Sequence, residues 1–246
     1  TARDVLASKK IKIHKIEVVS EDTFRVQMNP LEQSQKSDIV RDLGKYGNVT
    51  EKSFETVGPT IGRETQLNAI KAVIVASIAI TLYIAFAFRK VSNPVSSWKY
   101  GICAIAALLH DVLIVIGVFS ILGKLLNVEV DSLFITALLT VMGFSVHDTI
   151  VVFDRIRENL RKNFDLKFEE VVNNSLLETL NRSLNTSLTV LIVLFALLLF
   201  GGETIRWFIV ALLIGIISGT YSSIFNASQL LVAWYELDKK RLRLKT

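Results

Sequence analysis

The sequence predicts a membrane-embedded, all-α helical bundle that carries a small α+β domain at its N-terminal end. Of the 246 residues, 51% are hydrophobic, and after Asn68 they are concentrated in five long runs with few charges. A helix of about 20 apolar residues spans the hydrocarbon core of a bilayer. Before Asn68 the chain is polar, as in an ordinary soluble domain.

Residues 1–60 predict the small α+β domain. Phe24, Val26 and Met28 alternate with polar residues, which is typical of a strand with one buried face. The strand before it breaks its own alternation at His14-Lys15, where we expect a bulge. The predicted order is β-β-α-β, with strands over 11–19, 23–28 and 49–57 and a helix over 32–46.

Five apolar segments follow in a transmembrane domain of residues 61–238, and each is long enough to span a tilted path. The predicted spans are 69–88, 100–122, 133–153, 184–200 and 205–234. Lysine and arginine are concentrated in the first and third connections and in a basic tail, 239–246, and such residues mark the cytoplasmic side. We therefore expect an extracytoplasmic N-terminal domain and a cytoplasmic C-terminus.

An extracytoplasmic domain needs a route across the membrane. The first residues, Thr1 to Lys10, are polar and do not resemble a cleavable signal peptide. We expect either that a first membrane helix is missing from this chain or that the chain is the second part of a longer polypeptide, and we favour the missing helix.

Composition and spacing argue against several classes of function. Much of the basic excess behind the net charge of +5 lies at helix ends and in short connections, which argues against a nucleic-acid partner. The single cysteine, Cys103, cannot form an internal disulfide, and the histidines lack the ligand spacing of a zinc site. No nucleophile–base set or nucleotide loop appears, so we expect neither an enzyme nor a cofactor.

Asp148 and Arg182 are the main candidates for function. Asp148 lies in the third span and Arg182 at the start of the fourth, so we expect both near the cytoplasmic side, close enough to meet. An ionised side chain inside a bilayer costs at least about 2.5 kcal/mol, and such residues usually serve a function. We favour a proton relay, in which a moving arginine changes how tightly the carboxyl group holds its proton; the alternative is a static pair that locks two helices together.

Two histidines and a second aspartate are weaker candidates for the same relay. His110 and Asp111 lie near the middle of the second span, where a relay and a plain hydrogen bond to a neighbouring helix are both open. Adjacent residues on a helix point about 100° apart, so the two need not share a partner. We interpret His147 as a helix-contact donor rather than a titrating group.

The last span and the third connection carry structural signals. Gly215 and Gly219, four residues apart, predict close helix packing. The helix that follows is unusually polar, so one of its faces must be buried in protein or line a wet cavity. The connection 154–181 predicts a continuation of the third helix, followed by an amphipathic piece along the membrane surface over 164–172 or by a loop that caps the bundle.

Several motifs together resemble one family. Residues 143–159 read GFSVHDTIVVFDRIREN, which is similar to the signature of the SecF protein-export membrane proteins. Further similar motifs follow in collinear order and cover nearly the whole chain: FETVGP at 54–59, LHDV at 109–112, LNRS at 180–183, FGG at 200–202 and GTYSSIF at 219–225.

The resemblance implies a subunit that works with SecD beside the SecYEG channel of the bacterial cell (inner) membrane. It implies that the proton motive force, rather than a bound cofactor, helps unfolded preproteins cross after SecA has inserted them. SecA would then be an indirect partner, YajC and membrane lipid further ones, and nucleic acid none. Asp148 and Arg182 match the family positions implicated in proton conduction. The family belongs to the resistance–nodulation–division (RND) superfamily.

Three departures from the family pattern bear on this interpretation. Phe144 stands where the family usually has Tyr, His147 stands where it usually has Asn, and the family's first membrane helix is absent. His147 adds a titratable ring beside the main carboxylate. The alternatives are a small-molecule exporter of the RND superfamily, for which the N-terminal domain is small, and an assembly subunit that transports nothing.

Overall fold

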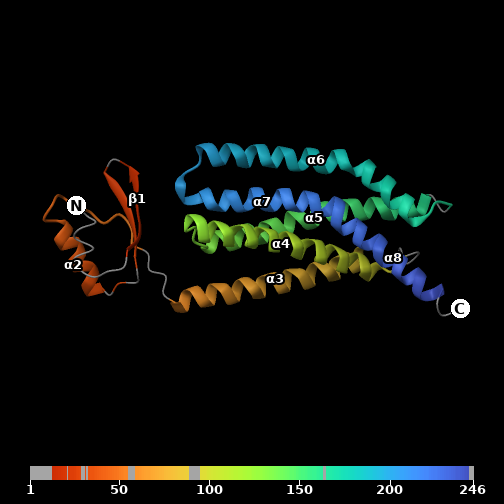
Figure 1. Cartoon of the computed structure of the whole chain (residues 1–246), viewed down its shortest axis with the longest axis horizontal. Helices are drawn as coiled ribbons and strands as arrows, with labels where there is room; N and C mark the ends of the chain where they lie inside the picture. Colours follow the sequence, from red (N-terminus) through yellow and green to blue (C-terminus); the bar gives the residue numbers. More distant parts are fainter. Residues whose placement is uncertain are drawn as a thin grey trace. The chain divides into compact units, whose positions relative to one another are not determined.

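The computed structural model describes residues 13–20, 22–28, 31, 33–54, 59–88, 95–162 and 165–243. The chain divides into two compact units, Thr1–Leu67 and Asn68–Thr246. Figure 1 shows the first unit as a strand pair with a helix and the second as a bundle of long helices.

Before residue 55, the described residues of the first unit form a hairpin and a helix. Strands β1 (Ile13–Ser20) and β2 (Thr23–Met28) pair antiparallel, with Val18 opposite Phe24. The register shifts between Ile13 and Lys15, where the broken alternation predicted a bulge. Helix α2 (Gln33–Leu43) buries Ile39.

The third strand predicted over 49–57 does not form in the part of it that the structure describes. Residues 49–54 are exposed and carry no strand pairing, and 55–57 lie outside the described residues. Side chains tether this segment instead. Lys36 Nζ of α2 pairs with Glu51 at 2.7 Å, and Lys52 Nζ donates to Thr23 Oγ1 at 2.8 Å. Because the backbone forms no ladder there, the described part of the sheet has two strands.

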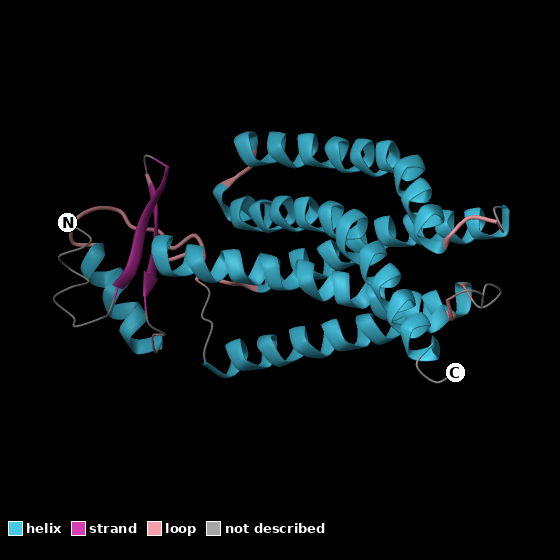
Figure 2. Cartoon of the chain, turned by 45° about the vertical axis from the view of Figure 1, so that its right-hand side comes forward, coloured by secondary structure: helices cyan, strands magenta, loops and turns pink. Residues whose placement is uncertain are grey.

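Within the described ranges, five helices are long and apolar enough to cross a membrane, and this number agrees with the predicted spans. The elements are α3 (Pro59–Ala87), α4 (Ser97–Leu126), α5 (Ser132–Lys162), α6 (Phe168–Phe200) and the run from η1 (Glu203–Ile205) through α7 (Arg206–Ser222) and η2 (Ser223–Ala227) to α8 (Ser228–Arg243). The turn η2 is π-helical. Figure 2 shows α4, α5, α6 and α7 lying side by side.

The amphipathic surface piece and the capping loop expected after α5 are both replaced by the start of α6. Phe168, Val171 and Val172 are buried in the protein rather than laid along a membrane surface. The Phe168 ring packs on Tyr235 of α8 with 4.7 Å between centroids. Of the predicted piece, Phe164 lies outside the described residues.

Helices α4, α5 and α7 form the centre of the bundle, and their buried apolar residues make two clusters. The first contains Val112, Val141 and Ile216, and the second contains Cys103 and Val152 and extends to Leu231 of α8. Along α4, α5 and the α7–η2 run, residues of the first cluster are separated from residues of the second by the buried polar residues Asp111, Ser145, Asp148 and Ser218. The candidate site is therefore a polar layer set between two apolar ones.

A buried polar layer as the candidate functional site

The polar layer contains two carboxylates and many hydroxyls. Its buried members are Asp111, Ser145, Asp148, Thr149, Ser183, Ser187, Ser218, Thr220, Ser222, Ser223 and Ser228. Lipid offers no hydrogen bonds, so each of these groups needs a partner within the protein or a ligand. Their partners show what the layer can do.

Asp111 of α4 is fully buried and accepts hydrogen bonds from three hydroxyl groups on two other helices. Ser145 Oγ of α5 and Ser222 Oγ of α7 each donate to Oδ2 at 2.6 Å, and Ser218 Oγ of α7 donates to Oδ1 at 2.8 Å. His110 Nδ1 lies 3.2 Å from Oδ1. The carboxylate thus joins α4, α5 and α7 in the middle of the bundle.

The two predicted packing glycines lie at the contact between α5 and α7. A Cβ atom on Gly215 would collide with the side chain of Val141, and one on Gly219 would lie 3.1 Å from Ser145 Cβ. The missing side chains let α7 approach α5 closely. This approach brings Ser218 and Ser222 to the same carboxylate as Ser145.

Asp148 lies three residues after Ser145 on α5, and its environment is different. Its side chain is 3% exposed, and Oδ2 has no hydrogen-bond partner among the described residues. Thr149, its neighbour, donates to the Ser145 carbonyl at 3.1 Å. The layer therefore holds one satisfied carboxylate and one carboxylate with an open oxygen.

Arg182 of α6 interacts electrostatically with Asp148 but does not touch it. Among the residues that the structure describes, its guanidinium makes no hydrogen bond and no ion pair. Arg182 is exposed, with Asn181 and Asn185 exposed beside it. Among the described residues, the predicted pair interacts electrostatically but forms no ion pair.

The histidines lie at the edge of the layer. His147 is exposed on α5 and interacts electrostatically with Asp148, while the side chain of His110 is 42% exposed. In a bilayer these rings face lipid, water or another protein. Neither ring fills the core of the bundle, and among the described residues His147 donates no hydrogen bond to another helix.

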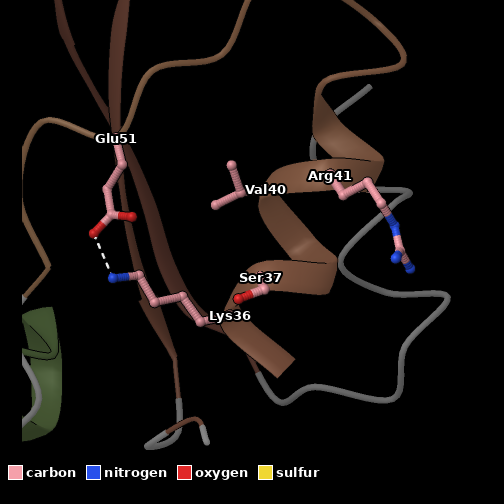
Figure 3. Close-up of a pocket in the computed structure, with 5 residues that line it drawn as sticks. All are labelled: Lys36, Ser37, Val40, Arg41 and Glu51. Carbon is pink, nitrogen blue, oxygen red and sulfur yellow. Dashed lines mark ion pairs between the residues drawn. The ribbon is translucent and has the colours of Figure 1, made fainter. Parts of the chain in front are cut away.

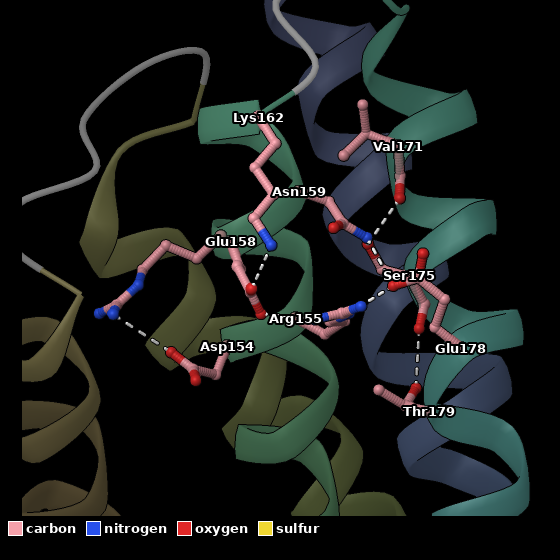
Figure 4. A network of polar contacts seen from close by, with 10 residues as sticks. Asp154, Arg155, Glu158, Asn159, Lys162, Val171, Ser175, Glu178 and Thr179 are labelled. Atoms are coloured by element: carbon pink, nitrogen blue, oxygen red, sulfur yellow. Dashed lines mark hydrogen bonds and ion pairs between the residues drawn. The ribbon is translucent and has the colours of Figure 1, made fainter.

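A second polar network joins α5 to α6 beyond the layer (Figure 4). Arg155 pairs with Glu158 at 2.6 Å and also with Glu178 of α6. Asn159 Nδ2 donates to Ser175 Oγ and to Glu178 Oε2, both at 3.0 Å. The network fastens the Lys162 end of α5 to the first half of α6.

Sequence reasoning found both buried carboxylates and missed their serine partners. Ser218 and Ser222 are four residues apart, so they share a helix face, and this spacing was the signal that could have identified them. Nothing local marks Ser145, which lies 34 residues from Asp111. The α5–α6 network was also missed, because its charges resemble an ordinary connection.

The first unit offers a shallow pocket lined by Lys36, Ser37, Val40, Arg41 and Glu51. Figure 3 shows the ion pair of Lys36 with Glu51 at one side and Arg41 pointing away from that pair. Because Lys36 is already paired with Glu51, the pocket suggests no ligand.

Comparisons with known proteins give a consistent result. The family described as "Protein export membrane protein SecD/SecF, C-terminal" matches residues 35–237. A protein translocase subunit SecF from Thermobaculum terrenum is 57% identical over 221 residues, which are 90% of this chain and 68% of that protein. A protein translocase subunit SecDF from Thermus thermophilus is 42% identical over 86% of this chain and 27% of its own length.

A solved structure extends the similarity to the fold. The crystal structure of SecDF in the super-membrane-facing form matches with a TM-score of 0.70 and 38% sequence identity. The match covers 91% of this chain and 29% of that one. The chain therefore spans less than a third of the SecDF protein that it resembles.

Proposed function

Because this chain belongs to the SecD/SecF family of protein-export membrane proteins, we propose that it is the SecF subunit of a SecD–SecF complex. In this role it uses the proton motive force to help preproteins pass through SecYEG after SecA has inserted them. Similarity to SecDF, in which the matching region is part of one longer chain, supports SecD as the partner.

The open oxygen of Asp148 is the observation that carries the proton-driven role. A buried polar atom without a partner is rare, and at a functional site it marks a group that awaits a ligand. Here the ligand of Asp148 is a proton. A buried charge is costly, no cation contacts this carboxylate, and binding a proton removes its charge. Arg182 provides a movable positive charge that interacts more strongly with the ionised form.

The exposed polar face of α6 supports a protein partner on that side. Asn181, Arg182 and Asn185 are exposed in a helix that is long and apolar enough to cross the membrane. Polar groups at that depth face a protein or a water-filled cavity rather than lipid. SecD is the partner that would cover them and supply a facing carboxylate.

The proton gradient carries enough energy for this work. One proton that falls through 100 mV releases about 2.3 kcal/mol, which changes a conformational equilibrium by about 40-fold. A shift of that size suffices to bias the N-terminal unit between a state that holds the emerging preprotein and one that releases it.

Replacement of Asp148 and of Arg182 in the full complex tests the proposal. Asp148→Asn and Arg182→Lys should each abolish the stimulation of preprotein export by an imposed proton gradient, in vesicles that contain SecD and the channel. Asp154→Asn is the matched control, because Asp154 lies on the same helix, is exposed, and pairs only loosely with Arg157 at 3.4 Å. Normal gradient-dependent export by both variants at full expression would reduce the chain to an assembly subunit.

A further inference from the structure

Asp111 forms a second buried carboxylate site, apart from the open oxygen of Asp148. Its three hydroxyl partners come from α5 and α7, and all three bonds are between 2.6 and 2.8 Å long. The Asp111 side chain is 1% exposed. A site so completely built, in a helix that can cross a membrane, calls for a reason beyond packing.

A count of hydrogens shows that a proton on Oδ2 of Asp111 disturbs this arrangement. Each serine hydroxyl carries one hydrogen, and a carboxylate accepts all three. A proton on Oδ1 can point to His110 Nδ1 and leave the three bonds intact, whereas a proton on Oδ2 points to Ser145 Oγ or Ser222 Oγ, whose own hydrogen must then turn away. Ser222 has a second acceptor in reach, the Gly219 carbonyl at 3.4 Å. Ser145 Oγ and Ser218 Oγ make no second hydrogen bond among the described residues.

Ser222 lies at the junction between α7 and the turn η2. It is the last residue of α7, directly before the π-helical turn η2. Such turns interrupt the regular helix hydrogen bonds and often lie at functional sites. The turn contacts α4, α5 and α8, so Ser222 lies beside a segment that packs against three other helices.

The charged groups around Asp111 leave both charge states open. On α4 itself, His110 Nδ1 lies 3.2 Å away; α5 contributes Asp148 and the exposed His147. From Trp207 to Gln229, α7, η2 and the start of α8 carry only Tyr221 as a titratable group, and it is exposed. Among the described residues, no lysine or arginine forms an ion pair with Asp111. Three hydroxyls favour the carboxylate, while exclusion from water favours the neutral acid.

We propose that Asp111 is a second proton-binding site and that its proton moves Ser222 between two acceptors. When the proton binds Oδ2, the hydrogen bond from Ser222 Oγ to Oδ2 breaks, and Ser222 Oγ donates to the Gly219 carbonyl instead. When the proton leaves, the three-serine arrangement returns. The site thereby links proton occupancy to the junction between α7 and η2. Only the source of the proton, the membrane gradient, rests on the proposed function.

Infrared difference spectroscopy of the full chain in lipid tests this directly. In an Asp148→Asn background, a pH change should alter the carbonyl-stretch band of a protonated, buried carboxyl group. The band should be absent from the Asp111→Asn/Asp148→Asn double variant. Identical spectra from the two proteins would overturn the proposal.

Serine variants keep the test sharp if the double variant does not insert. Ser222→Ala retains the carboxylate but removes the moving donor, so it should shift the Asp111 band. Ser223→Ala is the matched control, because Ser223 Oγ donates to the Thr220 carbonyl and not to Asp111. An unshifted band in Ser222→Ala would rule out the exchange.

The two proposals fail separately. If Asp148→Asn exports normally while the Asp111 band still responds to pH, the relay through Asp148 is wrong and the Asp111 site stands. If Asp148→Asn abolishes the effect of the gradient while the band does not respond, the Asp111 proposal alone is lost.

Discussion

At the scale of single residues, the two buried aspartates share a chemical group and differ in their partners. Asp111 has three serine hydroxyls and a nearby imidazole, whereas Asp148 Oδ2 has no hydrogen-bond partner among the described residues. The hydrogen bonds of Asp111 join three helices, whereas Asp148 Oδ2 is free to accept a new hydrogen bond or a proton. The two sites lie one helical turn apart along α5, through Ser145.

Ser218→Ala should destabilise the bundle modestly. It removes one hydroxyl donor from the buried Asp111 carboxylate, and polar contacts between membrane helices contribute about 0.6 kcal/mol on average and up to about 1.7. We expect a loss near the upper end, about 1–1.5 kcal/mol, in the free energy of unfolding measured in mixed micelles, because the acceptor is fully buried and the bond is 2.8 Å long.

Thr140→Ala is the control for Ser218→Ala. Thr140 is exposed, and its hydroxyl donates to the Thr136 carbonyl of its own helix at 2.8 Å. Its loss should change the unfolding free energy by less than about 0.5 kcal/mol. Equal effects of the two variants would contradict a special strength of the Asp111 site.

The sequence identified the charged residues of the layer because they interrupt apolar runs. It could not identify their partners, since Ser145 and Ser222 lie 34 and 111 residues from Asp111. Serine is also common in membrane helices, where its hydroxyl usually bonds to its own helix. Which serine faces a carboxylate is decided only by the packing of α4, α5 and α7.

At the scale of whole helices, the α5–α7 contact depends on glycine. Gly215→Ala should push α7 away from Val141 and cost about 1–3 kcal/mol, the usual range for overpacking. Thermal unfolding in detergent would measure this as a lower midpoint temperature. The displacement should also weaken the hydrogen bonds from Ser218 and Ser222 to Asp111.

Gly117→Ala provides the matched control on α4. A Cβ atom there has no other atom within 4 Å, so the change adds helix propensity without a collision. We expect unchanged stability or a gain of up to about 1 kcal/mol. A comparable loss in both variants would mean that glycine acts through backbone flexibility and not through close packing.

The start of α6 shows why its length escaped sequence-based prediction. The buried stripe of its first half includes Ser175, Thr179 and Ser183 rather than only large apolar residues. A stripe of small polar residues gives little hydrophobic periodicity, so the helix seemed to begin near residue 184. The predicted third strand does not form over residues 49–54. There the side chains of Glu51 and Lys52 hold the segment instead of strand pairing.

At the scale of the whole molecule, an odd number of crossings by the five candidate spans would place the two ends of the chain on opposite sides of the membrane. From the basic connections we predict that the C-terminus faces the cytoplasm. Single cysteines at Glu51→Cys and Lys240→Cys, in a Cys103→Ala background, test this arrangement. Both positions are exposed, and Cys103 is the only native cysteine.

In intact cells, a membrane-impermeant maleimide should label the protein with Glu51→Cys. The protein with Lys240→Cys should react only after the cells are permeabilised. Labelling of both variants in intact cells would mean that the chain crosses the membrane an even number of times. Labelling of Lys240→Cys alone would mean that the orientation is the opposite of the expected one.

The number of spans was predictable from composition, because run length and bilayer thickness fix it almost alone. The central position of α4, α5 and α7 was not predictable in this way. All five spans are apolar. In the most apolar stretch of α4, of α5 and of the α7–α8 run, about half of the residues are buried inside the bundle, compared with 6% in α3 and 17% in α6. Small residues and polar layers, rather than hydropathy, decide which helices pack inward.

A contact between two indole rings gives the molecule an intrinsic spectroscopic probe. Trp98 of α4 and Trp234 of α8 meet edge to face, with 5.1 Å between centroids and 87° between planes. Rings so close couple their electronic transitions, and the third tryptophan, Trp207, lies far along the chain at the start of α7. Any swing of α8 beyond η2 would therefore change the near-ultraviolet circular dichroism of the unlabelled protein.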